Sequence, residues 1–228
     1  MRALGTAPHL VEQVSQALLD EITSGALAPG ARLIQEQIAQ ALGVSRQPVQ
    51  QALLLLRNQG VLRDAPGRGL IVAPLDSGHV RHVYALRAVL EGLAARDAAK
   101  ARHERAPRQG AALLDAGRRA VASGSLARMI AADTRFHEFL YGLSGSPLIG
   151  PALATHLTYT QRAMGEVLVQ DTAQRTAVWD QHAQMLDAIC AGDGDGAEQL
   201  AREHIEEASA LLLAGLEAGI RTRTPPAG

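Results

Sequence analysis

The stretch Ile38–Arg57, which reads IAQALGVSRQPVQQALLLLR, decides how the first part of this 228-residue chain folds. Its apolar residues before Gly43 recur at helical spacing, and Gly43 supplies the left-handed backbone position that ends a helix. Ser45 is a natural N-cap for a second helix, and Pro48 falls in the first turn of that helix, where a proline is tolerated. The stretch therefore predicts two helices joined by a tight turn.

The second of these helices has one apolar face and a polar beginning. Its apolar face repeats at i, i+3, i+4, i+7 and consists of Val49, Ala52, Leu53 and Leu56. The polar residues at its start are Ser45, Arg46, Gln47 and Gln50. A DNA-recognition helix presents such a short polar face to base edges and phosphates, but two ordinary packed helices also fit the pattern. The flanking sequence has to decide between these interpretations.

The flanks favour a winged helix-turn-helix. Upstream, residues 10–22 form an amphipathic pattern that predicts a first helix, and residues 24–30 form a turn-rich break. Downstream, residues 60–63 and 70–72 predict two short strands, joined through the hairpin turn at residues 65–69. Three helices followed by a two-stranded wing make a winged helix-turn-helix.

Over about residues 8–75, the segments SGALAPGARL, IAQALGVSRQPVQQALLLLRNQGVL and PGRGLIV resemble the GntR family of bacterial transcription regulators. The resemblance implies that the start of the recognition helix and the tip of the wing contact DNA. It implies this role for Ser45, Arg46, Gln47, Gln50, Arg68 and Gly69. We accordingly expect a homodimer that reads two half-sites of a pseudo-palindrome, and repression rather than activation.

Two positions depart from the family pattern. The family usually has an arginine where this chain has Gln50, and often a basic residue where it has Glu36. Losing an arginine removes a bidentate partner for guanine or phosphate, whereas glutamine is better suited to adenine. The operator sequence therefore does not carry over, and we expect the affinity for DNA to be modest.

Composition indicates a cytoplasmic protein without a membrane segment. The sequence contains no signal peptide and no apolar span of about 20 residues. A single cysteine, Cys190, excludes an internal disulfide, and we expect it to be a small buried residue. The formal net charge is −1, so phosphate contacts must come from the local placement of cations rather than from a basic field.

A domain boundary is expected at residues 73–78, which separates a DNA-binding domain at 1–75 from a second domain at 76–228. No strand pattern follows the boundary. The second domain is predicted to contain six helices, at 78–103, 107–123, 125–143, 147–165, 171–191 and 194–219, with a frayed tail at 221–228. The fold class is thus mainly α, a winged helix-turn-helix plus an all-α helical bundle that binds an effector and dimerises.

Four ionisable residues fall on apolar helix faces in the second domain. Asp133 and His137 are four residues apart on one helix, while His182 and His204 belong to two others. Burying such groups is expensive unless they satisfy one another. A divalent ion such as Zn²⁺, Ni²⁺ or Mn²⁺ would do so, because imidazole nitrogens and carboxylates are common ligands of these metals. Any one histidine by itself is better explained as a hydrogen-bonded core residue.

The motifs around these residues are similar to the FCD effector domain of FadR-like GntR regulators, over roughly residues 79–218. They are DTRFH from Asp133, LSGSPL from Leu143, HAQMLDAICAGD from His182, and HI at His204. Six helices resemble the VanR-type branch. The resemblance implies that the Asp and three His bind an ion and that a small effector completes its coordination.

Three further residues are candidates for effector contacts. Arg87 borders the bundle interior, where it would suit a carboxylate effector, although an i, i+4 pair with Glu91 explains it equally well. Tyr159 and Arg162 are expected to line the same cavity. The other histidines are expected at the surface: His9, His79, His82, His103 and His156.

The leading hypothesis is a DNA-binding regulator that senses a small organic acid, such as a sugar acid, hydroxy acid or dicarboxylate, at a metal. Two alternatives remain open at this point. One is a regulator whose metal is structural or is itself the signal. The other is a metalloenzyme in which the ion activates water. The sequence argues against an enzyme, because it offers no spare carboxylate or histidine placed as a general base.

Overall fold

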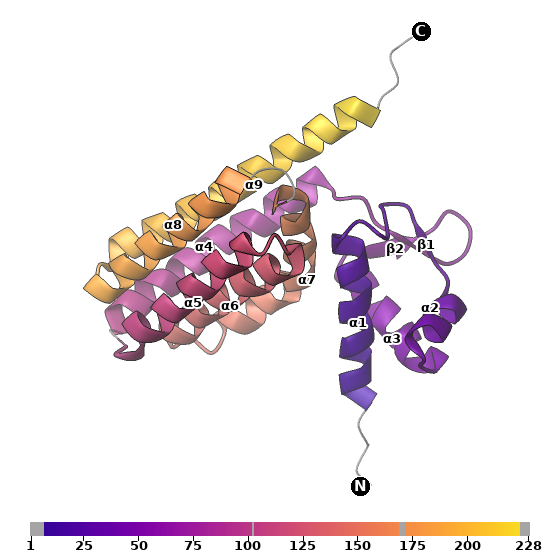
Figure 1. Cartoon of the computed structure of the whole chain (residues 1–228), viewed down its shortest axis with the longest axis horizontal. Helices are drawn as coiled ribbons and strands as arrows, with labels where there is room; N and C mark the ends of the chain where they lie inside the picture. Colours follow the sequence, from indigo (N-terminus) through magenta and orange to yellow (C-terminus); the bar gives the residue numbers. More distant parts are fainter. Residues whose placement is uncertain (1–6, 102, 169–171, 224–228) are drawn as a thin grey trace, which may run out of the picture. The chain divides into compact units, whose positions relative to one another are not determined.

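A computed structural model describes residues 7–101, 103–168 and 172–223 of the chain. The chain divides into two compact units, Met1–Pro74 and Leu75–Gly228 (Figure 1). The predicted frayed tail falls partly on residues 224–228, which lie outside the described residues, while residues 221–223 continue the last helix. None of the helices described is long and apolar enough to span a membrane.

From residue 7 onward, where its structure is described, the N-terminal unit consists of three helices and a small antiparallel sheet. The helices are α1 (Ala7–Thr23), α2 (Gln35–Leu42) and α3 (Arg46–Asn58). The strands are β1 (Arg32–Leu33), β2 (Leu62–Asp64) and β3 (Leu70–Val72), in the order β1-β3-β2. Their shared core includes Val49, Ala52, Leu56, Val61 and Val72, all with 0% exposure.

The sheet corrects the predicted two-stranded wing, because β1 adds a third strand. Arg32 pairs with Ile71 and Leu33 with Leu70. Two residues are too few to show an alternating pattern, so no strand could be predicted there. β2 also begins later than predicted, since the amide of Gly60 bonds to the carbonyl of Arg57 and so closes α3.

The turn between α2 and α3 follows the predicted chemistry. Gly43 ends α2 in the left-handed region at φ 64°, where a glycine carries no side-chain penalty. Ser45 holds the N-cap position of α3 in an extended conformation. Its hydroxyl does not bond to the helix amides, so the predicted cap is correct in position but not in hydrogen bonding.

The described part of the C-terminal unit is all helical. Its six helices are α4 (Ser77–Ala101), α5 (Arg105–Ala122), α6 (Leu126–Ser144), α7 (Ile149–Leu168), α8 (Thr172–Ala191) and α9 (Gly194–Arg223). α9 runs along α4, and α6 packs against α4 and α5 (Figure 1). Predicted and observed helix ends mostly agree within two residues, although residues 102 and 171 lie outside the described ones. The expectation of a buried cysteine is wrong, because Cys190 is exposed on α8.

Two glycines allow α8 to lie close against α5. A β-carbon at Gly110 would meet the side chain of Leu186 at 2.5 Å, and one at Gly117 would meet the ring of Trp179 at 2.1 Å. Trp179 is only 3% exposed and packs edge-on against His182 at a centroid distance of 4.8 Å. The absence of a side chain at Gly117 therefore helps to position a histidine of the candidate site.

We predict that Gly117→Ala destabilises the helical unit by about 1–3 kcal/mol, because the added methyl group would overlap the buried ring of Trp179. Gly142→Ala is the matched control. Gly142 also lies inside a helix, but a β-carbon there meets nothing within 4 Å. Urea unfolding followed by fluorescence reports on this unit, since Trp179 is the sole tryptophan in the chain. Equal midpoints for the two variants would contradict the packing argument.

Candidate functional site

The predicted DNA-contacting residues of α3 lie together on its exposed N-terminal end. Ser45, Arg46, Gln47 and Gln50 are all solvent-exposed, while Pro48 and Val49 between them are buried. The guanidinium of Arg46 forms an ion pair with Glu36 of α2. Arg46 is therefore paired with a carboxylate at the position where the family often has a basic residue.

The wing tip carries a second exposed cationic group. Arg68 and Gly69 are exposed, and the amide of Ala65 bonds to the carbonyl of Gly69 at 2.9 Å to close the turn. Arg32 of β1 donates to the carbonyl of Arg68, which brings another exposed cation to the wing. Sequence reasoning missed Arg32, because it failed to detect the strand on which this residue lies.

In the C-terminal unit, three helices bring Asp133, His137, His182 and His204 together. One ligand atom from each lies within 4.8 Å of the others. The Nε2 atom of His182 is 3.3 Å from the Nε2 of His204 and 3.6 Å from Oδ1 of Asp133, and the Nε2 of His137 is 3.7 Å from Oδ2 of Asp133. All four residues are at most 8% exposed.

The opposite ring nitrogens of two of these histidines meet acceptors outside the group. Nδ1 of His137 lies 2.6 Å from Oε2 of Glu91, and Nδ1 of His204 lies 2.8 Å from Oε1 of Gln181. A proton on Nδ1 of His204 would donate to Gln181 and leave the Nε2 lone pair facing inward, whereas Nδ1 of His137 lies close to the Glu91 carboxylate without the geometry of a hydrogen bond. Glu91 and Gln181 are site residues that sequence reasoning did not assign.

Electrostatics favour neutral imidazoles at two of the three histidines. Burial lowers the pKa of His204 to about 3, and burial with the neighbouring His204 lowers the pKa of His182 well below its usual value. Burial also acts against the charged form of His137, but the carboxylates of Glu91 and Asp133 outweigh it and raise its pKa. Two of the three imidazoles are therefore neutral, while burial raises the pKa of the Asp133 carboxyl.

The donor set fits a divalent metal ion. Nε2 of His137 is buried and has no hydrogen-bond partner among the described residues, and the same holds for Nδ1 of His182. Three inward-facing nitrogens and a carboxylate cannot satisfy one another fully by hydrogen bonds, because only one or two protons are available between them. Imidazole nitrogens with one carboxylate are ligands that Zn²⁺, Ni²⁺ and Mn²⁺ accept.

Arg87 is part of the same buried network. It is 7% exposed, its Nε lies 2.7 Å from Oε1 of Glu91, and its guanidinium carbon sits 5.0 Å from the ring centroid of Tyr84. Glu91 is 3% exposed and contacts Arg87 with one oxygen and His137 with the other. The i, i+4 pair that the sequence allowed therefore exists, but as a buried bridge to the histidine cluster rather than as a surface pair.

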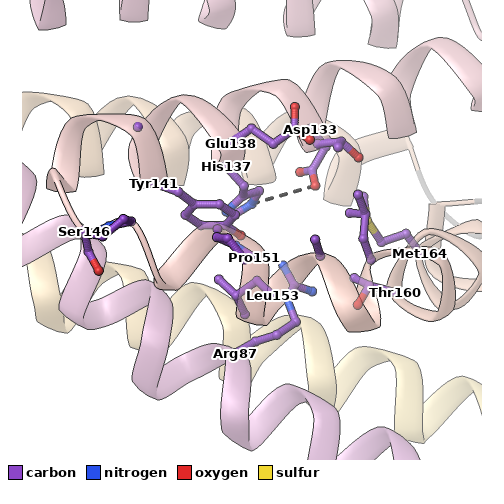
Figure 2. A pocket seen from close by; sticks show the side chains of 16 residues that line it. Arg87, Asp133, His137, Glu138, Tyr141, Ser146, Pro151, Leu153, Thr160 and Met164 are labelled. Atoms are coloured by element: carbon purple, nitrogen blue, oxygen red, sulfur yellow. Dashed lines mark ion pairs between the residues drawn. The ribbon is translucent and has the colours of Figure 1, made fainter. Parts of the chain in front are cut away.

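A cavity of about 500 Å³ opens beside the cluster and is bounded by Arg87, Asp133 and His137. Figure 2 shows Asp133, His137 and Tyr141 along one helix, with Arg87 extending from α4 into the same space. A second, smaller cavity of about 50 Å³ touches the same three residues together with His204. The larger cavity therefore gives a small molecule access to the group that fits a metal.

Tyr159 and Arg162 are not among the residues that line either cavity. Tyr159 is 3% exposed and packs in a separate apolar cluster with Val80 and Ile205. Arg162 is likewise buried, at 3% exposure. The α7 residues that line the larger cavity are instead Gly150, Pro151, Leu153, Ala154, Leu157, Thr160 and Met164. Neighbouring helix positions differ by about 100° in direction, so a small error in helix rotation moved the expected contacts.

The remaining histidines lie away from the cluster. His9, His79 and His82 are exposed, whereas His103 and His156 are half-buried. His79 is not isolated, because its ring packs edge-on against Tyr159 at 4.6 Å. None of the five belongs to the group that fits a metal.

Comparison with protein families and with known proteins finds matches to both halves of the chain. Residues 10–72 match the family of bacterial regulatory proteins called gntR, and residues 82–207 match the FCD domain. An HTH-type transcriptional regulator in an unstable DNA locus of Streptomyces ambofaciens is 30% identical over 188 residues, which cover 78% of this chain and 75% of that protein. The HTH-type transcriptional repressor RspR of Escherichia coli K12 is 26% identical over 198 residues, 87% of this chain and 86% of that protein.

Solved structures share the fold. Escherichia coli McbR/YncC superposes with a TM-score of 0.76 at 24% identity, covering 89% of this chain and 96% of that one. A GntR regulator from Rhodococcus sp. RHA1 gives 0.73 at 25% identity, covering 90% and 97%. These families and relatives are transcription regulators rather than enzymes. The chain belongs to the GntR family of bacterial transcription regulators and carries an FCD effector domain.

Proposed function

We propose that the chain is a homodimeric repressor whose DNA binding responds to a small organic acid held at a metal ion by the FCD domain. The observation that carries the proposal is the buried meeting of Asp133, His137, His182 and His204 beside a cavity of about 500 Å³. Two copies would read two halves of a pseudo-palindromic operator. Because the target is chromosomal DNA, the proposal also places the protein in the cytoplasm.

The charges around the cavity explain why a metal is part of the proposal. Apart from His137, whose pKa the carboxylates raise, Arg87 is the one cationic side chain among the described lining residues, and Glu91 already neutralises it. Asp133 and Glu138 add negative charge to the lining. An anion would therefore be repelled unless a divalent ion among the four ligands reversed the local charge. Four protein ligands leave one or two positions open in five- or six-coordinate ions, and a carboxylate would occupy them.

The effector acts on DNA binding only through a difference in its affinity for two arrangements of the regulator. A regulator whose metal is purely structural is the competing proposal. It accounts for the four ligands and for the bridge from Arg87 through Glu91 to His137, but it leaves the adjoining cavity without a role. The experiments on metal and effector below separate the two proposals.

The first prediction of this proposal concerns DNA binding. Arg46→Ala and Arg68→Ala should each weaken operator binding, by about 1–3 kcal/mol where the arginine reads a base. Glu36→Gln should instead strengthen binding, because it frees Arg46 and removes a negative charge from the face. Arg118→Ala is the control, since Arg118 is an exposed cation of the other unit. Gel-shift titrations at several salt concentrations measure all four variants, and affinities equal to the parent for both Arg46→Ala and Arg68→Ala would contradict the assigned DNA-binding face.

The second prediction concerns the metal. A ligand that binds only the folded state stabilises it by about 2.7 kcal/mol at 100 times its dissociation constant, so chelation should lower the melting temperature. His182→Ala should remove this metal-dependent shift and blunt the effector response, while apo-protein binding to the operator is retained. His156→Ala, a half-buried histidine outside the cluster, should behave like the parent. Metal content by elemental analysis accompanies each melting curve.

Two results would count against this proposal. Absence of metal under every loading condition would remove the site. An undiminished effector response in His182→Ala would mean that the effector binds elsewhere and that the metal is only structural.

The third prediction concerns Glu91, which positions His137 and does not itself join the four ligands. Glu91→Gln removes the acceptor charge beside Nδ1 of His137 and should weaken metal binding about 10–100-fold. It should also lower the stability of the metal-free protein, because Arg87 is left as an unpaired buried charge. Glu198→Gln is the control, since Glu198 pairs with Arg96 and Arg202 in a more exposed position. Unchanged metal affinity in Glu91→Gln would exclude the positioning role.

A further inference from the structure

We infer that the effector is a monocarboxylate with an extended apolar body, rather than a sugar acid or a dicarboxylate. The inference rests on the proposed function for the position of the carboxylate, next to the metal ligands and Arg87. It adds the chemistry of the rest of the molecule, which follows from the walls of the larger cavity.

One face of α7 forms an apolar wall of this cavity. Leu153, Leu157 and Met164 repeat at helical spacing along the helix and all line the cavity. Pro147 and Pro151 extend the same apolar surface toward the start of α7. In Figure 2, Leu153, Pro151 and Met164 border the space into which Arg87 and His137 project. An effector whose carboxylate lies near the cluster would therefore place the rest of its body against hydrocarbon.

Each Ser and Thr hydroxyl group along the cavity makes one hydrogen bond within the protein. Thr160 donates to the carbonyl of His156 at 3.0 Å, and Thr134 accepts from the amide of Gln161 at 3.3 Å. Ser146 accepts from the amide of Leu148 at 3.4 Å. A sugar acid carries several hydroxyl groups that need new partners when they leave water, and groups left unpaired cost affinity. The few hydroxyl groups of these walls can pair with only some of them.

A second carboxylate would find no cation. Apart from His137, Arg87 is the one cationic side chain among the described lining residues, and it lies at the metal-facing end with Glu91. Glu138, the exposed acid that also borders the cavity, would repel a second negative charge. The tyrosine in the lining is neutral, because burial and the carboxylate of Glu91 raise the pKa of Tyr141. Cavity charge thus supports one carboxylate per effector.

The size of the cavity separates a long body from a short one. At about 500 Å³ it falls within the range of about 300–1,000 Å³ typical of sites for organic ligands. Acetate would fill only the end of the cavity next to Arg87, Asp133 and His137. Each further methylene buried against the apolar wall should tighten binding about fourfold.

The test titrates the full-length protein, loaded with Zn²⁺, with acetate, butanoate, hexanoate, octanoate, octanedioate and gluconate, each followed by calorimetry. The dissociation constant is expected to fall about fourfold per methylene from acetate until the cavity is filled. Octanedioate and gluconate are expected to bind at least tenfold more weakly than octanoate. Leu157→Asn should weaken octanoate binding at least tenfold and leave acetate binding unchanged. Leu157 is half-buried and lines the cavity, and Leu211→Asn is the control because Leu211 is 40% exposed and outside it.

Three results would overturn the inference: affinity independent of chain length, tighter binding of gluconate or octanedioate than of octanoate, or no binding of any monocarboxylate in the series. Elemental analysis of the same samples distinguishes these outcomes from failure of the proposed metal site. If metal-free protein still binds octanoate more tightly than acetate, the apolar wall binds the effector body and the proposed metal site is wrong. If metal-loaded protein binds gluconate most tightly, the metal site stands and the apolar effector is wrong.

Discussion

The structure of the C-terminal unit depends on one buried polar cluster at which four helices meet. Asp133 and His137 come from α6, His182 from α8 and His204 from α9, and Glu91 of α4 contacts His137 from outside the group. Apolar rings enclose the cluster, since Phe136 stacks on His182 at 4.3 Å and Trp179 packs edge-on against the same histidine. Burying so many polar groups costs free energy unless they are paired, so the cluster constrains how these helices pack.

Glu91 connects this cluster to the adjoining cavity. One of its oxygens contacts Arg87 and the other contacts His137, so a single carboxylate joins the cavity's cation to a candidate metal ligand. Arg87 and His137 outweigh the effect of burial and keep the pKa of Glu91 below its usual value, so it stays ionised. An anion that approached Arg87 would compete with Glu91 for its guanidinium. A shift of the Glu91 carboxylate would then alter its contact with Nδ1 of His137. The cavity and the cluster are therefore one electrostatic unit.

The sequence predicted most of the architecture, because long helices with strong periodicity are visible locally. It also brought Asp133, His137, His182 and His204 forward as a set, since ionisable residues on apolar faces stand out in a helical pattern. Glu91 escaped notice because its spacing from Arg87 fits a surface pair, and burial on α4 is decided by packing against α9 and α6. The third wing strand has only two residues, and the exposure of Cys190 depends on which turn of α8 its neighbours cover. These features follow from tertiary contacts that no short stretch of sequence encodes.

The metal site is tested most directly by a crystal structure of metal-loaded protein, with anomalous data collected at the absorption edge of the bound metal. We predict an anomalous peak for a metal ion at about 2.0–2.2 Å from Nε2 of His137, His182 and His204 and from a carboxylate oxygen of Asp133. We also predict at least one further coordination position facing the larger cavity. A peak elsewhere, or histidine rings that hydrogen-bond to one another with no metal between them, would contradict the proposed metal site.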